Sequence, residues 1–214
     1  MLKSVYQNGG FYVGKYETGI ESTPKTSGSS TTAPKEIPVI KQNAYPYNNV
    51  TCSQAQTLAS KMESGKYTSS LMFGVQWDLV LKYLETKGTA QADLKTNSTN
   101  WGNYANNLWN ITNENSKYAP NGSGWTSGAY GKKDSNKSVL LSTGASETFS
   151  KQGIYDLAGN VWEWTLEYTS DSDYPCAGRG GLYSDYGDDG PAAYRGSDDT
   201  TGYDESIGFR VSLF

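Results

Sequence analysis

The groups best suited to chemistry in this sequence are phenols and carboxylates, and they gather in one stretch. The segment Tyr183 to Ser206 holds four tyrosines, six aspartates and one glutamate against a single arginine, and it has no Val, Ile, Leu, Met, Phe or Trp. A segment so poor in apolar side chains buries little of itself, so we expect it at the surface. Tyrosine gives a large contact area at low entropic cost, while Ser, Gly and Asp give adaptable hydrogen bonds. The composition favours a recognition surface over a catalytic cleft.

The predicted contacts are the tyrosines, the aspartates and one serine of this segment. They are Tyr183, Ser184, Asp185, Tyr186, Asp188, Asp189, Tyr194, Asp198, Asp199, Tyr203 and Asp204. Tyrosines should supply most of the binding energy, and aspartates should tune specificity. The acidic charge favours a basic protein ligand and argues against nucleic acid. Two alternatives stay open: an ordinary solvated loop, or a calcium site at the aspartates of 185–189, although their spacing fits no EF-hand.

Other reactive groups are scarce. The chain has no histidine, which removes the usual general base, the Ser-His and Cys-His nucleophile pairs, and histidine metal sites. Its two cysteines, Cys52 and Cys176, could pair only if the fold brought them together, and the sequence does not decide this. No apolar run approaches the roughly 18 residues of a membrane span, so we expect no direct membrane insertion.

Two helices should position this segment. Thr51 and Gln54 form a capping box that predicts a helix to about Glu63, before Gly65. A second helix is predicted over 74–86. Its expected core-facing stripe is Val75, Leu79 and Tyr83, with Leu84 on the same side.

The remaining chain predicts short strands and long loops. Strands are expected at 11–18, 154–164 and 208–213, and the chain should enter the first almost at once, as in the C-terminal part of a longer protein. Residues 20–42 are rich in Ser, Thr, Pro and Lys and predict an exposed loop or insertion. Residues 97–131 predict an ordered loop pinned by Trp101, Trp109 and Trp125.

Several motifs together resemble the formylglycine-generating enzyme (sulfatase-modifying factor) family. They are Phe11-Tyr-Val-Gly-Lys-Tyr-Glu, Gln76-Trp-Asp, Gly153-Ile-Tyr-Asp-Leu-Ala-Gly-Asn-Val-Trp-Glu-Trp, Arg179-Gly-Gly and Gly208-Phe-Arg. The resemblance implies one α+β domain over 1–214 with a C-type-lectin-like fold, which has a small twisted antiparallel sheet, two helices and many loops.

The enzymes of that family carry two copper-binding cysteines between Arg-Gly-Gly and Gly-Phe-Arg. In this chain the corresponding span, 182–207, has no cysteine, and by spacing the two positions fall near Asp185 and Gly190. Without thiols the oxidase chemistry lacks ligands of the required softness. We therefore expect no enzyme activity, and an intact or decayed oxidase is the alternative.

The chain resembles a second branch of the family more closely, the variable proteins of diversity-generating retroelements. Their hypervariable segment is also bounded by Arg-Gly-Gly and Gly-Phe-Arg, which here delimits 179–210, and mutagenesis of adenines in Asn-type codons yields mainly Asn, Ser, Tyr, Asp, Thr, Gly and Ala. The resemblance implies a binding protein for a ligand on a cell or particle surface, displayed on a phage virion or a bacterial cell. No cofactor is required.

The family resemblance also implies a structural calcium ion. The residues that match the calcium-binding positions of the enzymes are Asp156, Gly159, Val161 and Glu163, and the alternative is that Glu163 caps backbone donors of the same turn. Nearby, Trp162 and Trp164 share one strand face and predict core packing. Arg210 predicts a structural guanidinium that bonds carbonyls or carboxylates.

Overall fold

Both predicted helices form, α2 over Cys52–Ala59 and α3 over Gly74–Thr86. The computed structural model describes residues 1–63, 65–134 and 136–214. At the start of α2, Thr51 and Gln54 make both bonds of the capping box, which satisfies first-turn amides. The helix ends before the predicted Glu63 because the amides of Lys61 and Met62 bond carbonyls three residues back rather than four.

Two short helices were not predicted, α1 over Leu2–Asn8 and α4 over Gln91–Lys95. The expectation that the chain enters a strand at once is therefore wrong. Helix α1 buries none of its residues and ends at Gly9, whose φ of 77° is left-handed. The first strand, β1, follows at Tyr12–Val13.

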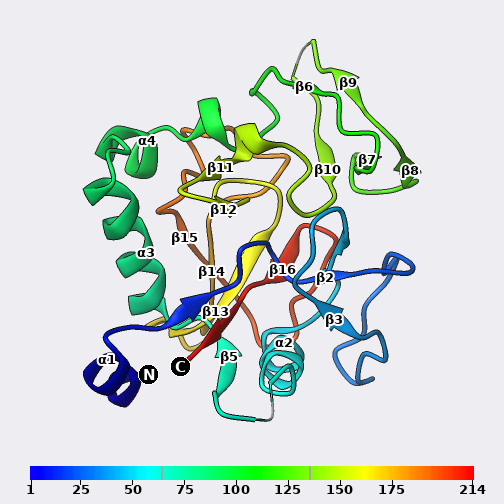
Figure 1. The fold of residues 1–214 in the computed structure, drawn as a ribbon. Coiled ribbons are helices and arrows are strands. Elements are labelled where there is room, and N and C mark those ends of the chain that lie inside the picture. Colours follow the sequence, from blue (N-terminus) through cyan, green and yellow to red (C-terminus); the bar gives the residue numbers. More distant parts are fainter. Residues whose placement is uncertain (64, 135) are drawn as a thin grey trace.

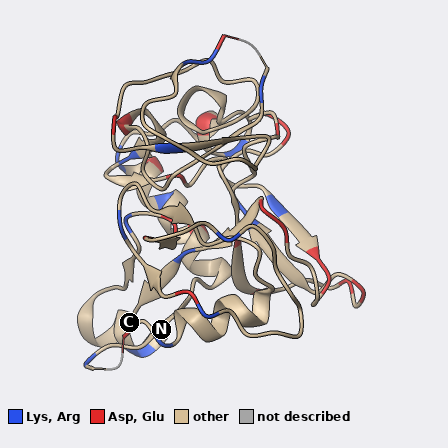
Figure 2. Ribbon diagram, turned by 90° about the vertical axis from the view of Figure 1, so that its right-hand side faces the viewer, with Lys and Arg blue, Asp and Glu red and all other residues tan. Residues whose placement is uncertain are grey.

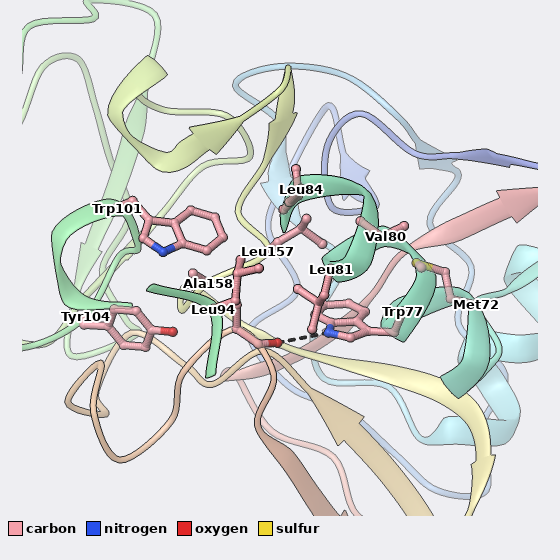
Figure 3. Close-up of a cluster of buried hydrophobic side chains, with 11 residues drawn as sticks. Met72, Trp77, Val80, Leu81, Leu84, Leu94, Trp101, Tyr104, Leu157 and Ala158 are labelled. Carbon is pink, nitrogen blue, oxygen red and sulfur yellow. Dashed lines mark hydrogen bonds between the residues drawn. The ribbon is translucent and has the colours of Figure 1, made fainter. Parts of the chain in front are cut away.

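The buried face of α3 differs from the predicted one. Val75, Leu79 and Tyr83 are 52%, 46% and 44% exposed, whereas Leu84 is buried as expected. The helix carries a second apolar stripe, which contains Trp77, and this stripe faces the core. Figure 3 shows its members Trp77, Val80, Leu81 and Leu84 packed with Leu157 and Ala158. A tryptophan buries more apolar area than any member of the exposed stripe, which explains the choice.

The central sheet has the strand order β15-β14-β13-β16. Its strands are β13 (Trp162–Tyr168), β14 (Cys176–Arg179), β15 (Arg195–Asp198) and β16 (Ile207–Phe209). Strand β14 pairs antiparallel with β13 and with β15, but β16 lies parallel to β13. The expected small antiparallel sheet therefore has one parallel edge.

A second sheet, β1-β17-β5, brings the two ends of the chain side by side (Figure 1). Strand β17 (Val211–Leu213) pairs antiparallel with β1 and with β5 (Ser69–Leu71). The predicted strand at 208–213 is thus two strands in different sheets, interrupted at Arg210.

The predicted strand at 154–164 is also interrupted. Only β12 (Ile154–Tyr155) and the start of β13 are extended. Between them Asp156, Gly159 and Asn160 adopt left-handed φ values of 58°, 72° and 64°. Such residues turn the chain instead of extending it.

Within the described residues, the other strands are short and form the small sheets β3-β2-β4, β10-β7-β8, β6-β9 and β11-β12. Their bounds are β2 (Gly19–Ile20), β3 (Pro38–Val39), β4 (Tyr45–Pro46), β6 (Asn110–Ile111), β7 (Lys117–Pro120), β8 (Thr126–Ser127), β9 (Gly131–Lys132), β10 (Val139–Leu141) and β11 (Ser150–Lys151). Most of the predicted loop at 20–42 is the irregular connection 21–37 between β2 and β3, but the range also contains Ile20 of β2 and all of β3. The segment 97–131 is not only loop, because it contains β6, β7 and β8, but Trp101 and Trp109 are buried as predicted.

The core lies on both sides of the central strands, with α3 on one side and α2 on the other (Figure 1). Trp164 is fully buried beside α2, and its indole donates to the Val50 carbonyl at 2.9 Å. Trp162 lies on the same strand face and is half-buried, so the predicted core role of both tryptophans is confirmed. Every described helix falls short of the length and apolar character that a membrane crossing needs. Most of the ribbon carries neither acid nor base (Figure 2).

Candidate functional site

The displayed segment, residues 183–206, is held by backbone bonds to a fixed loop at 98–107. The amide of Ser98 donates to the Gly187 carbonyl at 2.8 Å, and the amide of Ala105 donates to the Asp185 carbonyl at 2.9 Å. The Tyr104 hydroxyl, fully buried, lies 2.7 Å from the Gly190 carbonyl. Because these bonds use backbone atoms of the segment, they do not depend on which side chains it carries.

Ala192 fixes the segment to the core. It is fully buried, its amide donates to the Ser98 hydroxyl at 2.9 Å, and its carbonyl accepts from the Trp77 indole at 2.9 Å. Figure 3 shows this last bond reaching from α3. The expectation that the whole segment is superficial is wrong here, because a small residue fits against α3 where a larger one would not.

The fixed loop is in turn supported by a buried lysine. The ammonium of Lys133 donates to the carbonyls of Tyr104 and Ala105 at 2.6 and 3.1 Å and lies 5.0 Å from the Trp109 ring centre. Burial lowers its pKa to about 8. Lys133 thus binds carbonyls of the fixed loop. The amides and the Tyr104 hydroxyl of the same loop bind the displayed segment.

The predicted contacts divide by exposure into three groups. Ser184, Tyr186, Asp188, Asp189, Tyr203 and Asp204 are exposed, Asp185, Tyr194, Asp198 and Asp199 are half-buried, and Tyr183 is buried. The exposed residues come from two loops, 184–189 and 203–204, which flank β15. These exposed contacts therefore form two patches along the chain, and Arg195 and Ser197 of β15, between them, are also exposed.

The prediction that Tyr183 contacts a ligand is wrong. Its side chain is 4% exposed and packs with Val161, Leu140 and Ala119. Burial, with Glu205 nearby, raises the pKa of its hydroxyl to about 12, so the phenol is neutral near pH 7. The tyrosine lies just after Arg179-Gly-Gly, where the chain passes through the core before reaching the surface.

Four of the aspartates accept backbone amides in the loops, among them Asp198, which accepts from the amide of Asp199 at 2.8 Å. Asp199 accepts from the amide of Thr201 at 2.6 Å, and the donors of Thr201 lower its pKa. Asp204 accepts from the amide of Ser206 at 2.7 Å. Asp185 accepts from the amide of Leu182 at 3.2 Å, while burial raises its pKa. The bonds of Asp199 and Asp204 are Asx turns, whereas Asp185 accepts from an amide three residues earlier. Asp188 and Asp189 are the exposed aspartates of the segment outside these bonds.

A tryptophan supports the strand that joins the two patches. Trp162 lies across β14 and β15, 5.7 Å from the ring centre of Tyr194. A Cβ at Gly196 would lie 2.3 Å from the Trp162 ring, so only glycine fits there. Tyr194 is therefore partly a packing residue and only partly available to a ligand.

The two exposed tyrosines have neighbours outside the segment. The Tyr186 hydroxyl accepts from the Asn136 amide group at 2.8 Å, and the residue is 42% exposed. Tyr203 is 39% exposed and rests on Gly28, where a Cβ would lie 2.3 Å from its ring. Both rings are partly immobilised, which lowers the entropy they lose on binding.

The positions assigned to the copper-binding cysteines lie against each other. A Cβ at Gly190 would lie 2.6 Å from the carboxylate of Asp185. The two positions inferred from sequence spacing are therefore neighbours in space. They hold Asp185, with a carboxylate, and Gly190, with no side chain, where the enzyme chemistry needs two thiols. These residues do not fit a copper ion.

The positions assigned to calcium form an ionic cluster instead. The guanidinium of Arg210 donates to both carboxylate oxygens of Glu163 at 2.6 to 3.1 Å, and also to the carbonyls of Gly14 and Tyr155 at 2.8 Å. The structural role predicted for Arg210 is confirmed. Glu163 is engaged by this cation rather than by backbone donors of its own turn, contrary to the alternative.

Two more buried carboxyls face this pair. Asp156 accepts from the amide of Gly144 at 2.6 Å, and burial raises its pKa to about 7. Glu17 accepts from the side chain of Asn160 at 2.8 Å, and burial and Asp156 raise its pKa well above the ordinary value.

A calcium ion does not fit this cluster. The guanidinium of Arg210 takes the place of a cation beside Glu163, and a second positive charge there would be repelled. Across the described ranges, no group of three or more His, Cys, Asp or Glu side chains is arranged to hold a metal ion.

A second ionic network borders the displayed segment on the α3 side. Arg179 is buried, donates to Asp78 and lies 5.9 Å from the ring centre of Trp77. Arg195, the cation within the segment, donates to Glu167 at 2.7 Å. This network ties β14 and β15 to α3.

Two hollows of the surface lie away from the displayed segment. A polar hollow of about 520 Å³ is lined by residues of 42–43, 110–115 and 145–148, and an apolar one of about 430 Å³ lies between α1 and α3. Neither of these two hollows includes a residue of the segment.

Comparison with known families identifies the chain. Residues 6–213 match the sulfatase-modifying factor enzyme 1-like domain. The chain belongs to this family. The expected α+β class and C-type-lectin-like fold are confirmed with it.

Comparison with solved structures gives lower similarity. Variable protein 1 of Treponema denticola is 21% identical, with a TM-score of 0.38, over 70% of this chain and 49% of that one. CarF is 24% identical, with a TM-score of 0.32, over 37% of this chain and 30% of that one. The chain thus spans half or less of the length of these structures. No curated protein matches it.

Sequence reasoning missed the residues that support the segment. Tyr104 and Lys133 donate to backbone carbonyls distant in sequence, and the Ser98 hydroxyl accepts from the distant amide of Ala192. No periodicity or motif marks them. The Gln76-Trp-Asp motif was a usable signal, because Trp77 and Asp78 both contact the segment or its flanking strand.

Proposed function

We propose that the chain is a non-enzymatic binding protein whose displayed segment recognises a protein on the surface of a cell or particle. The observation that carries this proposal is that the segment has exposed side chains, while its backbone is hydrogen-bonded to the buried part of the protein. A backbone held in this way tolerates many different exposed side chains, because the hydrogen bonds that fix it are made by main-chain atoms of the segment.

The residue types of the segment support diversification by a retroelement. The six exposed predicted contacts hold Ser, Tyr and Asp, all within the set that adenine mutagenesis of Asn-type codons yields, whereas the exposed Arg195 and Glu205 lie outside it. Display on a phage virion or a bacterial cell is part of the same proposal. No cofactor is required, because the contacts are side chains of the protein itself.

The missing thiols support the absence of oxidase activity. Asp185 and Gly190 occupy the relevant positions, and neither is a ligand for copper. Turnover of a cysteine-containing substrate peptide by the copper-treated chain, with aldehyde formation detected by mass spectrometry, would contradict the proposal.

The binding role can be tested with a displayed library. The six exposed predicted contacts, at positions 184, 186, 188, 189, 203 and 204, are randomised among Tyr, Ser, Asp, Asn and Gly, and the library is selected against lysozyme as a basic protein probe. We expect folded members that bind specifically and whose association slows at high salt. A matched library at the buried positions 183, 190, 192 and 196 should yield few folded members. If the first library folds but yields no binder, the proposal is wrong.

A further inference from the structure

The fold brings together the only two cysteines of the sequence. Cys52 is the first residue of α2, and Cys176 is the first residue of β14, far away along the chain. Both side chains are half-buried and pack against the apolar cluster that contains Trp164 and Phe209. A helix start and a strand start, each with one thiol, therefore meet at the same side of the central sheet.

Hydrogen bonds through β13 fix their approach. The Cys52 thiol donates to the Thr165 carbonyl at 3.7 Å, and the Thr165 hydroxyl donates to the carbonyl of Ala177, the neighbour of Cys176, at 3.2 Å. The two thiols are close enough that each affects the pKa of the other. Neither thiol is needed for the displayed segment or for the two ionic networks.

We propose that Cys52 and Cys176 form a structural disulfide that joins α2 to β14. The oxidant is a small-molecule disulfide, written RSSR. The thiolate of Cys176 attacks one sulfur of RSSR and expels RS⁻, and Cys52 then attacks the resulting mixed disulfide at the Cys176 sulfur and expels the second RS⁻. The two protons of the protein thiols end on two RSH molecules, and two electrons pass to the oxidant.

The surroundings of the two thiols indicate which one attacks the oxidant first. Burial, with Cys176 beside it, raises the pKa of Cys52 to about 12. Burial raises the pKa of Cys176 as well, but the Cys52 thiol opposes that shift. Cys176 is thus the better first nucleophile, and because both thiols are protonated near pH 7, oxidation should be slow there and faster at alkaline pH.

The disulfide would strengthen the scaffold rather than the binding surface. Strand β14 lies between β13 and β15, and β15 joins the two exposed patches of the displayed segment. A cross-link closing so long a chain segment removes much conformational freedom from the unfolded chain. The disulfide leaves every exposed side chain of the displayed segment unchanged. A stabilised scaffold would therefore support contact residues that can vary.

The test uses the full chain with oxidised and reduced glutathione. After oxidation we expect a monomer that has lost the mass of two hydrogen atoms, a peptide map that links Cys52 to Cys176, and no alkylation by iodoacetamide. The unfolding midpoint should rise by roughly 10 °C relative to the reduced protein and return on reduction.

The single variants Cys52→Ser and Cys176→Ser are the matched controls. Each should keep one alkylatable thiol or form a glutathione adduct, and neither should gain thermal stability on oxidation. The reduced and oxidised wild-type protein provide the comparison even if a variant folds poorly. Wild-type protein that keeps two alkylatable thiols at alkaline pH, carries glutathione on both cysteines, or forms only intermolecular dimers would overturn the proposal.

Discussion

Two regions of this protein hold their charged side chains in contrasting environments. In the displayed segment, Asp188 and Asp189 are exposed to solvent. Behind it, Glu163 and Arg210 are 1% and 0% exposed at their side chains and form a bidentate pair. The first region can change its side chains at little cost to folding, whereas the second leaves an unpaired buried charge if either partner is lost.

The difference explains how one chain can combine variability with a fixed fold. The Gly208-Phe-Arg motif that closes the segment contains Arg210, which bonds β13, the chain at Gly14 and the turn at Tyr155. The segment is therefore bounded by one of the most constrained residues of the molecule. Changes in its exposed loops do not reach that residue.

The largest expected effect is that of Arg210→Met. Removing the guanidinium leaves Glu163 buried without its partner, and we expect a loss of about 3–5 kcal/mol in the free energy of unfolding. The measurement is urea unfolding followed by tryptophan fluorescence. Arg195→Met, at a half-exposed ion pair, is the control and should cost no more than about 1 kcal/mol. Equal losses of unfolding free energy in the two variants would contradict the proposed difference between the buried and the exposed charges.

The next effect separates two tyrosines of the same segment. Tyr183→Ala should cost about 3 kcal/mol because it empties a buried site. Tyr186→Ala should change stability by no more than about 0.5 kcal/mol, since the ring lies on the surface. Thermal unfolding of both variants checks this. A large loss in Tyr186→Ala would assign that residue to the core.

The buried cluster should also give a pH dependence. The pKa of Asp156 is about 7 in the folded protein and about 3.9 in an unfolded chain, so the folded state binds more protons between these values. Stability should then fall as pH rises from about 4 to 7, by up to about 1.4 kcal/mol per pH unit from this group.

Asp156→Asn tests this directly, because an amide oxygen can still accept from Gly144 while the titration is gone. Unfolding curves across this range should show a shallower slope than the wild type. Glu17 and Glu163 face the same site, and their raised pKa values should leave part of the slope in the variant. An unchanged slope would mean that Asp156 titrates in the same way in both states.

The smallest effects belong to the exposed aspartates. Asp188→Asn and Asp189→Asn should each change the free energy of unfolding by no more than about 0.5 kcal/mol. Their effect should instead be seen in binding, as a weaker salt dependence of association with lysozyme when the changes are made in selected library members that keep Asp at 188 and 189. A stability change above this value would mean that these aspartates are part of the loop structure.

The sequence predicted the elements that local rules decide. The capping box at Thr51, the span of α3 and the structural role of Arg210 follow from short-range patterns. The inward stripe of α3 was wrong, because two stripes compete and only the tertiary contacts of Trp77 choose between them. Burial of Tyr183 was missed for the same reason, since composition describes a segment and not each residue in it.

The candidate metal site shows the limit of motif matching. Asp156 and Glu163 are adjacent in space as the family resemblance implies, but Arg210 satisfies Glu163 from a strand far along the chain. A family resemblance identifies the matching sequence positions, but the charged group that lies beside them, here Arg210, is set by the three-dimensional fold.

The most direct test of the central claim is sequencing the gene segment for residues 179–210 in many isolates. We expect substitutions at the six exposed predicted contacts, an adenine-rich near-copy and a reverse transcriptase gene nearby, and constancy at Tyr183, Ala192, Gly196 and Arg210. Substitutions spread equally over exposed and buried positions, or an adjacent sulfatase gene with neither retroelement part, would contradict it.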